Sequence, residues 1–149
     1  MPIPHRVVFV CTGNSARSQM AEGFGRAWAP HGSEIRSAGT HPSGLHPLTV
    51  DVMAEIGIDV RGQTSDGLAD LPVEAVDHFV TLCSHAEAHC PTLPQHMTRE
   101  HWPLPDPAAA AGPGGSIVSG FRVVRDDIAA RVAALFGIEN PLAAAEDGP

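Results

Sequence analysis

Short apolar runs alternate with amphipathic segments along this chain, which is the pattern of strands connected by helices. The clearest run, residues 6–10, is apolar and rich in β-branched side chains, and it predicts a central strand buried on both faces. Further strands are expected at residues 34–38, 77–82 and 100–102. Apolar side chains recur at helical spacing elsewhere and predict helices at residues 17–29, 47–57, 84–89 and 121–136. The alternation favours an open α/β sheet.

Two segments lack such periodicity. Residues 103–120 contain four prolines, four glycines and four consecutive alanines, which predicts a long loop. Residues 139–149 are mostly small and acidic, and we expect this tail to be frayed. Together with the length of 149 residues, these features predict one compact domain over residues 1–138.

Composition narrows the classes of function. Nine basic against seventeen acidic residues give a net charge of −8, which argues against nonspecific binding to nucleic acid. The apolar runs are too short to span a membrane, and the first residues lack the basic and apolar regions of a secretory signal, so we expect a cytoplasmic protein. Three cysteines fit neither a secreted disulfide framework nor a four-cysteine zinc site. In a reducing compartment such cysteines are more often reactive.

The loop after the first strand carries the strongest chemical signal. It consists of Cys11, Thr12, Gly13, Asn14, Ser15, Ala16, Arg17 and Ser18, directly before a predicted helix. Backbone N–H groups of such a loop, the helix N-terminus and the planar fork of Arg17 form a cradle for a tetrahedral oxyanion. The same field favours the thiolate of Cys11, which becomes a nucleophile facing the anion. Ser18 is a hypothetical hydrogen-bond donor to that thiolate.

This loop, followed by Gln19-Met20-Ala21-Glu22-Gly23, resembles the phosphate loop of the low-molecular-weight protein tyrosine phosphatase superfamily, and Ser37-Ala38-Gly39-Thr40 and Asp106-Pro107 match two further motifs of that group. The resemblance implies a single three-layer α/β domain with a four-stranded parallel sheet flanked by helices. It also implies that Asp106 is the general acid, although an ordinary turn aspartate is an equal alternative. The chain contains no tyrosine, and four alanines follow Asp106-Pro107, which weakens a phosphotyrosine specificity.

The other two cysteines, Cys83 and Cys90, follow the strand predicted at residues 77–82. On an intact helix His85 and His89 would point away from both thiols, toward a solvated face, so the four side chains would not share one metal ion. Seven residues of helix also rise about 10 Å, too far for a disulfide, so this helix has to open before the pair can bond. Two inert, buried cysteines are the alternative.

Cys83 and Cys90, with the neighbouring Val80-Thr81-Leu82, Pro91 and Glu100-His101-Trp102, resemble the arsenate reductases that share the phosphatase fold and are regenerated by thioredoxin. The resemblance implies a role in arsenic detoxification, with arsenate as substrate. In the implied relay Cys11 attacks arsenate, Cys83 attacks the Cys11 sulfur, and Cys90 then forms the final disulfide with Cys83. The alternatives are a low-molecular-weight phosphatase whose extra cysteines are protective or regulatory, and a non-catalytic thiol sensor that binds phosphate or arsenate and signals through its disulfide.

No organic cofactor is expected. Some members of this family bind potassium, and the positions that match its ligands here are Asn14, Glu22, Ser37 and Asp66. Oxygen ligands suit such a hard cation. Asp66 can instead cap a helix that begins nearby, and the sequence leaves both interpretations open.

Overall fold

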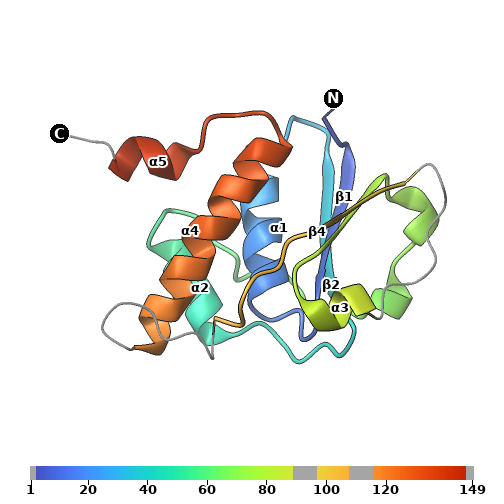
Figure 1. Cartoon of the computed structure of the whole chain (residues 1–149), viewed down its shortest axis with the longest axis horizontal. Helices are drawn as coiled ribbons and strands as arrows, with labels where there is room; N and C mark the ends of the chain where they lie inside the picture. Colours follow the sequence, from blue (N-terminus) through green and yellow to red (C-terminus); the bar gives the residue numbers. More distant parts are fainter. Residues whose placement is uncertain (1–2, 89–96, 108–115, 147–149) are drawn as a thin grey trace.

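Four parallel strands form one sheet in the order β2-β1-β3-β4 (Figure 1). The strands are β1 (Arg6–Cys11), β2 (Glu34–Gly39), β3 (His78–Thr81) and β4 (Thr98–His101). The structure is a computed structural model, and it describes residues 3–88, 97–107 and 116–146. The predicted four-stranded parallel α/β sheet is confirmed.

Strand β1 is a central strand of the sheet, and its side chains from Val7 onward are buried on both faces. Residues 7–10 are all at most 1% exposed, and the strand pairs with β2 on one edge and β3 on the other. This double burial explains the uninterrupted apolar run, since a strand with one wet face would alternate apolar and polar residues. Cys11 ends β1 opposite Gly39, the last residue of β2.

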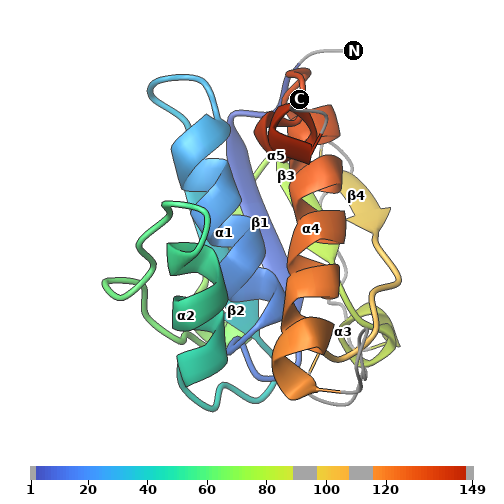
Figure 2. The same ribbon diagram turned by 90° about the vertical axis from the view of Figure 1, so that its left-hand side faces the viewer.

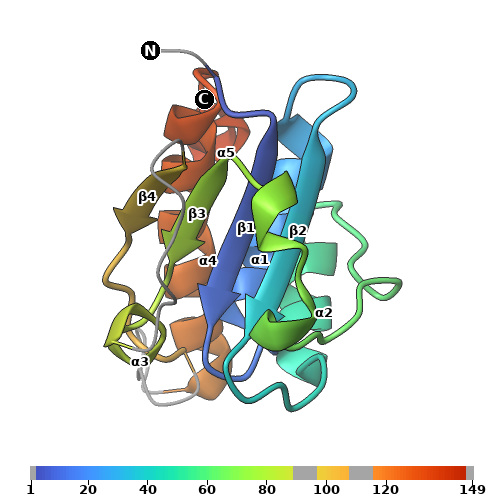
Figure 3. The same cartoon turned by 90° about the vertical axis from the view of Figure 1, so that its right-hand side faces the viewer.

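Long helices cover one face of the sheet, and two short 3-10 turns lie over the other. Helices α1 (Arg17–Trp28), α2 (Pro47–Ala54) and α4 (Ile117–Leu135) pack on one face (Figure 2). The 3-10 turns η1 (Leu68–Asp70) and η2 (Val73–Ala75) lie over the other, and α3 (Ser84–Ala88) lies beyond the carboxyl ends of β3 and β4 (Figure 3). Large buried side chains between the layers form the core, among them Phe9, Phe24, Phe79, Phe121 and Ile128. No helix in the described part of the chain has the length and apolarity to cross a membrane.

Element boundaries differ from the predictions where local capping decides them. Helix α4 begins at Ile117, earlier than expected, because the Ser116 hydroxyl oxygen accepts the Ser119 N–H at 3.0 Å. Helix α2 ends at Ala54, and the chain then turns through Gly57, whose φ of 81° is open to glycine at no steric cost.

The chain also contains a helix in place of the expected frayed tail, α5 (Pro141–Glu146). The Asn140 side chain accepts the Leu142 N–H at 3.0 Å, and Leu142 packs against the core. This part of residues 139–149 is therefore helical in the structure.

The strand order fixes where a ligand can bind. The chain moves from β1 to β2 on one side, and β3 and β4 then lie on the other side of β1. In open α/β sheets the crevice at such a reversal, at the carboxyl ends of the strands, is the usual binding position. Cys11 ends β1 at that edge, and Cys83 follows β3 at the same edge.

Candidate functional site

The loop after β1 is turned so that its peptide N–H groups face inward. Its carbonyl oxygens are taken by N–H groups of the segment after β2, in four hydrogen bonds of 2.8–3.2 Å: Thr40 to Cys11, His41 to Thr12, Ser43 to Gly13, and His46 to Ser15. Because a trans peptide plane directs its C=O and N–H in opposite directions, the next residue's N–H points away from this segment in each case. The arrangement supports the predicted oxyanion cradle, which a helix N-terminus at Arg17 completes.

A buried glutamine, for which the sequence carries no functional signal, holds the loop through hydrogen bonds to its backbone. Gln19 is fully buried, and its Nε2 donates to the carbonyl oxygens of Asn14 and Thr64, both at 2.9 Å. Gln63 Nε2 in turn donates to Gln19 Oε1 at 2.8 Å. Asn14 has a φ of 44°, a left-handed conformation that few side chains tolerate, so these bonds hold a bend that the loop needs. No spacing rule links Gln19 to Gln63, 44 residues away.

The Cys11 thiol sits in a hydrogen-bonded chain at the floor of the cradle. Its Sγ lies 2.9 Å from Ser18 Oγ, and Cys11 as a whole is 2% exposed. Ser18 Oγ also lies 2.8 Å from Asn14 Oδ1, to which it donates when Cys11 carries its own proton. When the thiol ionises, the single Ser18 hydrogen can turn to the sulfur instead. The predicted contact between Ser18 and Cys11 is therefore present.

Thr12, the residue next to Cys11, connects this loop to the second predicted cysteine. Thr12 Oγ1 lies 3.3 Å from Cys83 Sγ, and the residue Cys83 is 5% exposed. The Ala86 N–H also donates to Cys83 Sγ at 3.3 Å, so the sulfur caps the first turn of α3. Cys11 and Cys83 are both free thiols. Cys90 lies outside the described residues.

The expectation of a solvated histidine face on α3 is wrong for His85. This side chain is half-buried, and its ring centroid lies 5.5 Å from that of His41, which follows β2. Packing at the carboxyl edge of the sheet, where α3 meets the segment after β2, overrides the simple helical projection. His89 lies outside the described residues.

Arg17 joins the anion loop to the segment that carries Asp106. Its Nη1 donates to the Leu104 carbonyl oxygen at 3.0 Å, a contact between residues 87 positions apart. Asp106 follows two residues later and is exposed. Holding one nitrogen of the guanidinium leaves its other N–H groups for an oxyanion.

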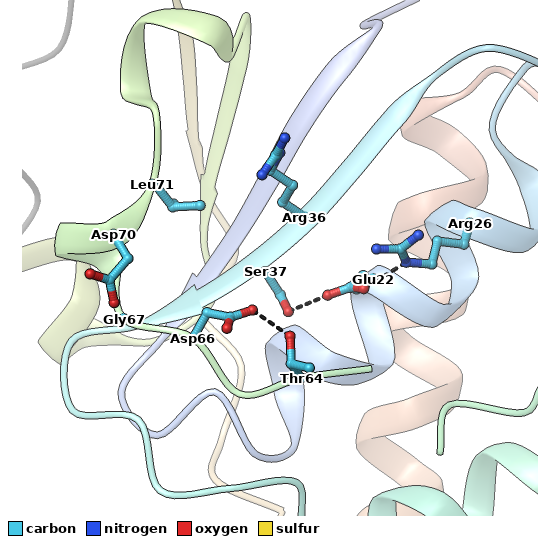
Figure 4. A pocket seen from close by; sticks show the side chains of 9 residues that line it. All are labelled: Glu22, Arg26, Arg36, Ser37, Thr64, Asp66, Gly67, Asp70 and Leu71. Carbon is cyan, nitrogen blue, oxygen red and sulfur yellow. Dashed lines mark hydrogen bonds and ion pairs between the residues drawn. The ribbon is translucent and has the colours of Figure 1, made fainter. Parts of the chain in front are cut away.

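Three of the four expected potassium ligands line one pocket beside α1, shown in Figure 4. These are Glu22, Ser37 and Asp66; Asn14 contacts the rim through a 3.4 Å hydrogen bond to the Asp66 carbonyl. Glu22 is 4% exposed, and it accepts hydrogen bonds from Ser37 and, at 2.6 Å, from Arg26 Nε.

The Arg26 guanidinium therefore already balances the buried carboxylate that would attract a cation. A second arginine, Arg36, also lines the pocket, so the described arrangement does not call for an alkali ion. The alternative role of Asp66, as a helix cap, is wrong. Gly67 is the N-cap of η1, with no side-chain cap, and the Asp66 carboxylate accepts the Thr64 hydroxyl at 2.7 Å.

Comparison with known proteins agrees with this site. The sequence profile of the family "Low molecular weight phosphotyrosine protein phosphatase" matches residues 6–146. The arsenate reductase of Shouchella clausii is 46% identical over 126 residues, which are 85% of this chain and 91% of that protein. The arsenate reductase of Bacillus subtilis is 43% identical over the same shares of the two chains.

Solved structures similar to this chain also include arsenate reductases. An arsenate reductase in the phosphate-binding state is 35% identical, with a TM-score of 0.72 over 89% of this chain and 96% of the other. A thioredoxin-dependent arsenate reductase of Corynebacterium glutamicum is 26% identical, with a TM-score of 0.66 over 90% of this chain and 62% of that one. With the cysteine at the end of β1, the inward-turned loop and a profile match along nearly its whole length, this chain belongs to the low-molecular-weight phosphotyrosine protein phosphatase family.

Proposed function

We propose that this protein is an arsenate reductase that converts arsenate to arsenite. Arsenate, like phosphate, is a tetrahedral oxyanion suited to the N–H cradle and to Arg17. The observation that carries the proposal is the contact between Thr12 and Cys83, because it brings a second thiol beside the loop that holds Cys11. The names of the relatives point to the same reaction. Because the thiols must start reduced, we expect the reaction in the cytoplasm, where it detoxifies arsenic.

The first two steps transfer electrons from sulfur to arsenic. The Cys11 thiolate attacks arsenic, an S–As bond forms, and a protonated oxygen leaves as water. Asp106 is our candidate for the acid that supplies this proton. The Cys83 thiolate then attacks the Cys11 sulfur, the S–As bond breaks, and its electron pair remains on arsenic, which leaves as arsenite. One Cys11–Cys83 disulfide forms for each As(V) reduced to As(III).

The last steps restore the enzyme. The Cys90 thiolate attacks the Cys83 sulfur, Cys11 leaves as a thiolate, and a Cys83–Cys90 disulfide remains. A dithiol such as thioredoxin reduces this disulfide by two successive exchanges. The thioredoxin dependence of the Corynebacterium relative supports this choice of reductant. No step requires a potassium ion at Asn14, Glu22, Ser37 and Asp66, since Arg26 already compensates Glu22.

The decisive experiment measures arsenate-dependent oxidation of NADPH in the presence of thioredoxin and thioredoxin reductase. We expect sustained turnover that requires all three proteins. No turnover with this system, with a glutaredoxin or with a small thiol would leave the phosphatase or the non-catalytic sensor as the better interpretation. An aryl phosphate serves as the comparison substrate: loss of its hydrolysis in Asp106→Asn would support the acid role, and unchanged hydrolysis would remove it.

A single-turnover experiment tests the order of the relay. Cys90→Ser should release one arsenite per enzyme and then stop, with a Cys11–Cys83 disulfide that mass spectrometry detects. Repeated turnover of this variant with thioredoxin alone would contradict the role assigned to Cys90.

A further inference from the structure

Helix α3 connects directly to Cys83 but is weakly buried. Of its residues Ser84–Ala88, only Ala86 is buried. Hydrophobic packing therefore contributes little to holding this helix, and polar contacts carry more of that role. Cys83 itself belongs to the first turn, since its carbonyl accepts the Glu87 N–H at 3.1 Å and its sulfur accepts the Ala86 N–H.

One carboxylate on α3 collects most of the described polar contacts to the sheet. Glu87 Oε2 accepts the Thr81 hydroxyl at 2.6 Å, and Glu87 Oε1 accepts Arg99 Nη2 at 2.7 Å. His101 Nδ1 lies 2.9 Å from Thr81 Oγ1 and 3.8 Å from Glu87 Oε2, so an Nδ1 proton on His101 extends the chain of donors. We call Glu87, Thr81, Arg99 and His101 the Glu87 cluster.

The cluster favours an ionised carboxylate at neutral pH. The hydrogen bond from Thr81 is the largest cause that lowers the pKa of Glu87, and the charges of Arg99 and His101 add to it, while partial burial opposes them. A charged acceptor makes hydrogen bonds stronger than a neutral amide of the same shape would. Glu87→Gln is therefore a nearly isosteric way to weaken the cluster.

We propose that the Glu87 cluster stabilises the dithiol form of the Cys83–Cys90 pair and so makes its disulfide easier to reduce. This inference rests on the proposed function, in which that disulfide forms. In the dithiol form Cys83 is 5% exposed and caps α3. In the disulfide form its sulfur has to be accessible to a reductant such as thioredoxin, so Cys83 has to leave the first turn when the disulfide forms. Opening that turn breaks the contacts of Glu87. Contacts present only in the dithiol form raise the reduction potential of the pair.

The expected effect follows from the strength of such contacts. A half-exposed ion pair together with a hydrogen bond to a charged group corresponds to roughly a three- to tenfold change in an equilibrium constant. Because a tenfold change corresponds to about 30 mV for a two-electron couple, Glu87→Gln should make the potential about 15 to 30 mV more negative. Arg99→Met should act in the same direction but less strongly, because Thr81 and His101 remain.

The experiment measures thiol–disulfide exchange with glutathione in the full chain carrying Cys11→Ser, so that Cys83 and Cys90 are the two cysteines left. Oxidised glutathione takes two electrons and two protons from the pair, giving one protein disulfide and two reduced glutathiones. Mass spectrometry after acid quenching gives the equilibrium constant for each variant. Amide exchange over residues 84–88 of the reduced proteins provides a readout that needs no disulfide. Asp59→Asn is the matched control, because Asp59 is an exposed carboxylate that pairs with Arg61 outside the cluster.

Two results would support the inference together: a three- to tenfold shift toward disulfide in Glu87→Gln, and faster amide exchange over residues 84–88. An unchanged constant in Glu87→Gln and Arg99→Met would overturn it, as would an equal shift in Asp59→Asn. Faster amide exchange with an unchanged constant would mean that the contacts survive in the disulfide form, which also overturns it. Failure of the parent to form any Cys83–Cys90 disulfide would instead refute the relay itself.

Discussion

Gly39 is the residue at which adding one carbon should disturb the anion loop most directly. It ends β2 opposite Cys11 in the sheet. A Cβ at this position would lie 2.6 Å from the Thr12 carbonyl oxygen and 2.9 Å from the Asn14 backbone nitrogen. Both neighbours are backbone atoms, so neither can turn away as a flexible side chain would. The change Gly39→Ala therefore forces the loop itself to move.

The size of the movement can be worked out. Side-chain Cβ atoms essentially never approach another atom within 3.0 Å, so the gap to Thr12 has to widen by at least 3.0 − 2.6 = 0.4 Å. Overpacking of this kind costs about 1–3 kcal/mol of unfolding free energy. A displacement of about 1 Å in a positioned catalytic site can lower the reaction rate roughly a hundredfold. If oxyanion binding depends as steeply on the position of the loop N–H groups, a shift of 0.4 Å should weaken it about tenfold. The loss in binding should exceed what the loss of stability alone would produce.

Two measurements test this prediction. Calorimetric titration with phosphate reports the dissociation constant of the loop, and urea unfolding reports the free energy of unfolding. Gly62→Ala is the control, because a Cβ there meets no atom within 4 Å, and we expect it to stay within about 1 kcal/mol of the parent. Phosphate affinity in Gly39→Ala within twofold of the parent would refute the reasoning.

The contacts of Ser18, Arg125 and Glu55 each predict a measurable effect. Ser18→Ala removes the hydroxyl 2.9 Å from Cys11 Sγ and should slow alkylation of Cys11 by iodoacetamide at pH 7 about tenfold; an unchanged rate would exclude Ser18 as a partner of the thiolate. Arg125→Met leaves the Val52 carbonyl and Glu55 without their buried donor, and should lower the urea unfolding free energy by about 2–3 kcal/mol. Hydrogen bonds from Arg122 first, and then from Arg125, lower the pKa of Glu55 from its usual 4.5 although burial opposes them. The ionised Glu55 carboxylate therefore contributes fully to stability above pH 4.5, and this contribution is lost as the pH falls below 4.5 through the lower pKa of the folded state. The difference in Tm between the parent and Glu55→Gln should shrink over that acidic range. A constant difference would contradict this.

The parts of the fold that the sequence predicted are those with local signals. The apolar run of β1 and the polar loop before α1 are contiguous, so each could be recognised without tertiary information. The contacts that assemble the site are not local: Thr12 meets Cys83 across 71 positions, and Arg17 meets Leu104 across 87. Only the sheet order brings those segments together, which is why the sequence located the residues but not their contacts.

The potassium ligands illustrate a different limit. The resemblance supplied four residues with oxygen atoms that could bind potassium. It did not include Arg26, whose positive charge already pairs with one of them, Glu22. Glu22 and Arg26 are four positions apart on α1, a spacing at which opposite charges pair on a helix surface. That signal was available in the sequence. Burial of Glu22 decides its importance, because a buried carboxylate needs a partner, and burial became known only from the packing of α1 on β2.

Under the proposed function, one loop geometry serves either of two reactions, and the group that next reaches the Cys11 sulfur adduct decides between them. Water attacking a phosphoryl–sulfur adduct at phosphorus completes a phosphatase cycle, whereas a thiol attacking the sulfur of an arsenic adduct leaves the electron pair on arsenic. Thr12 bears on this choice because it follows Cys11 directly and contacts Cys83. Replacing Thr12 with valine should therefore slow formation of the Cys11–Cys83 disulfide more than it weakens phosphate binding. Equal losses in both measurements would assign Thr12 to the cradle alone.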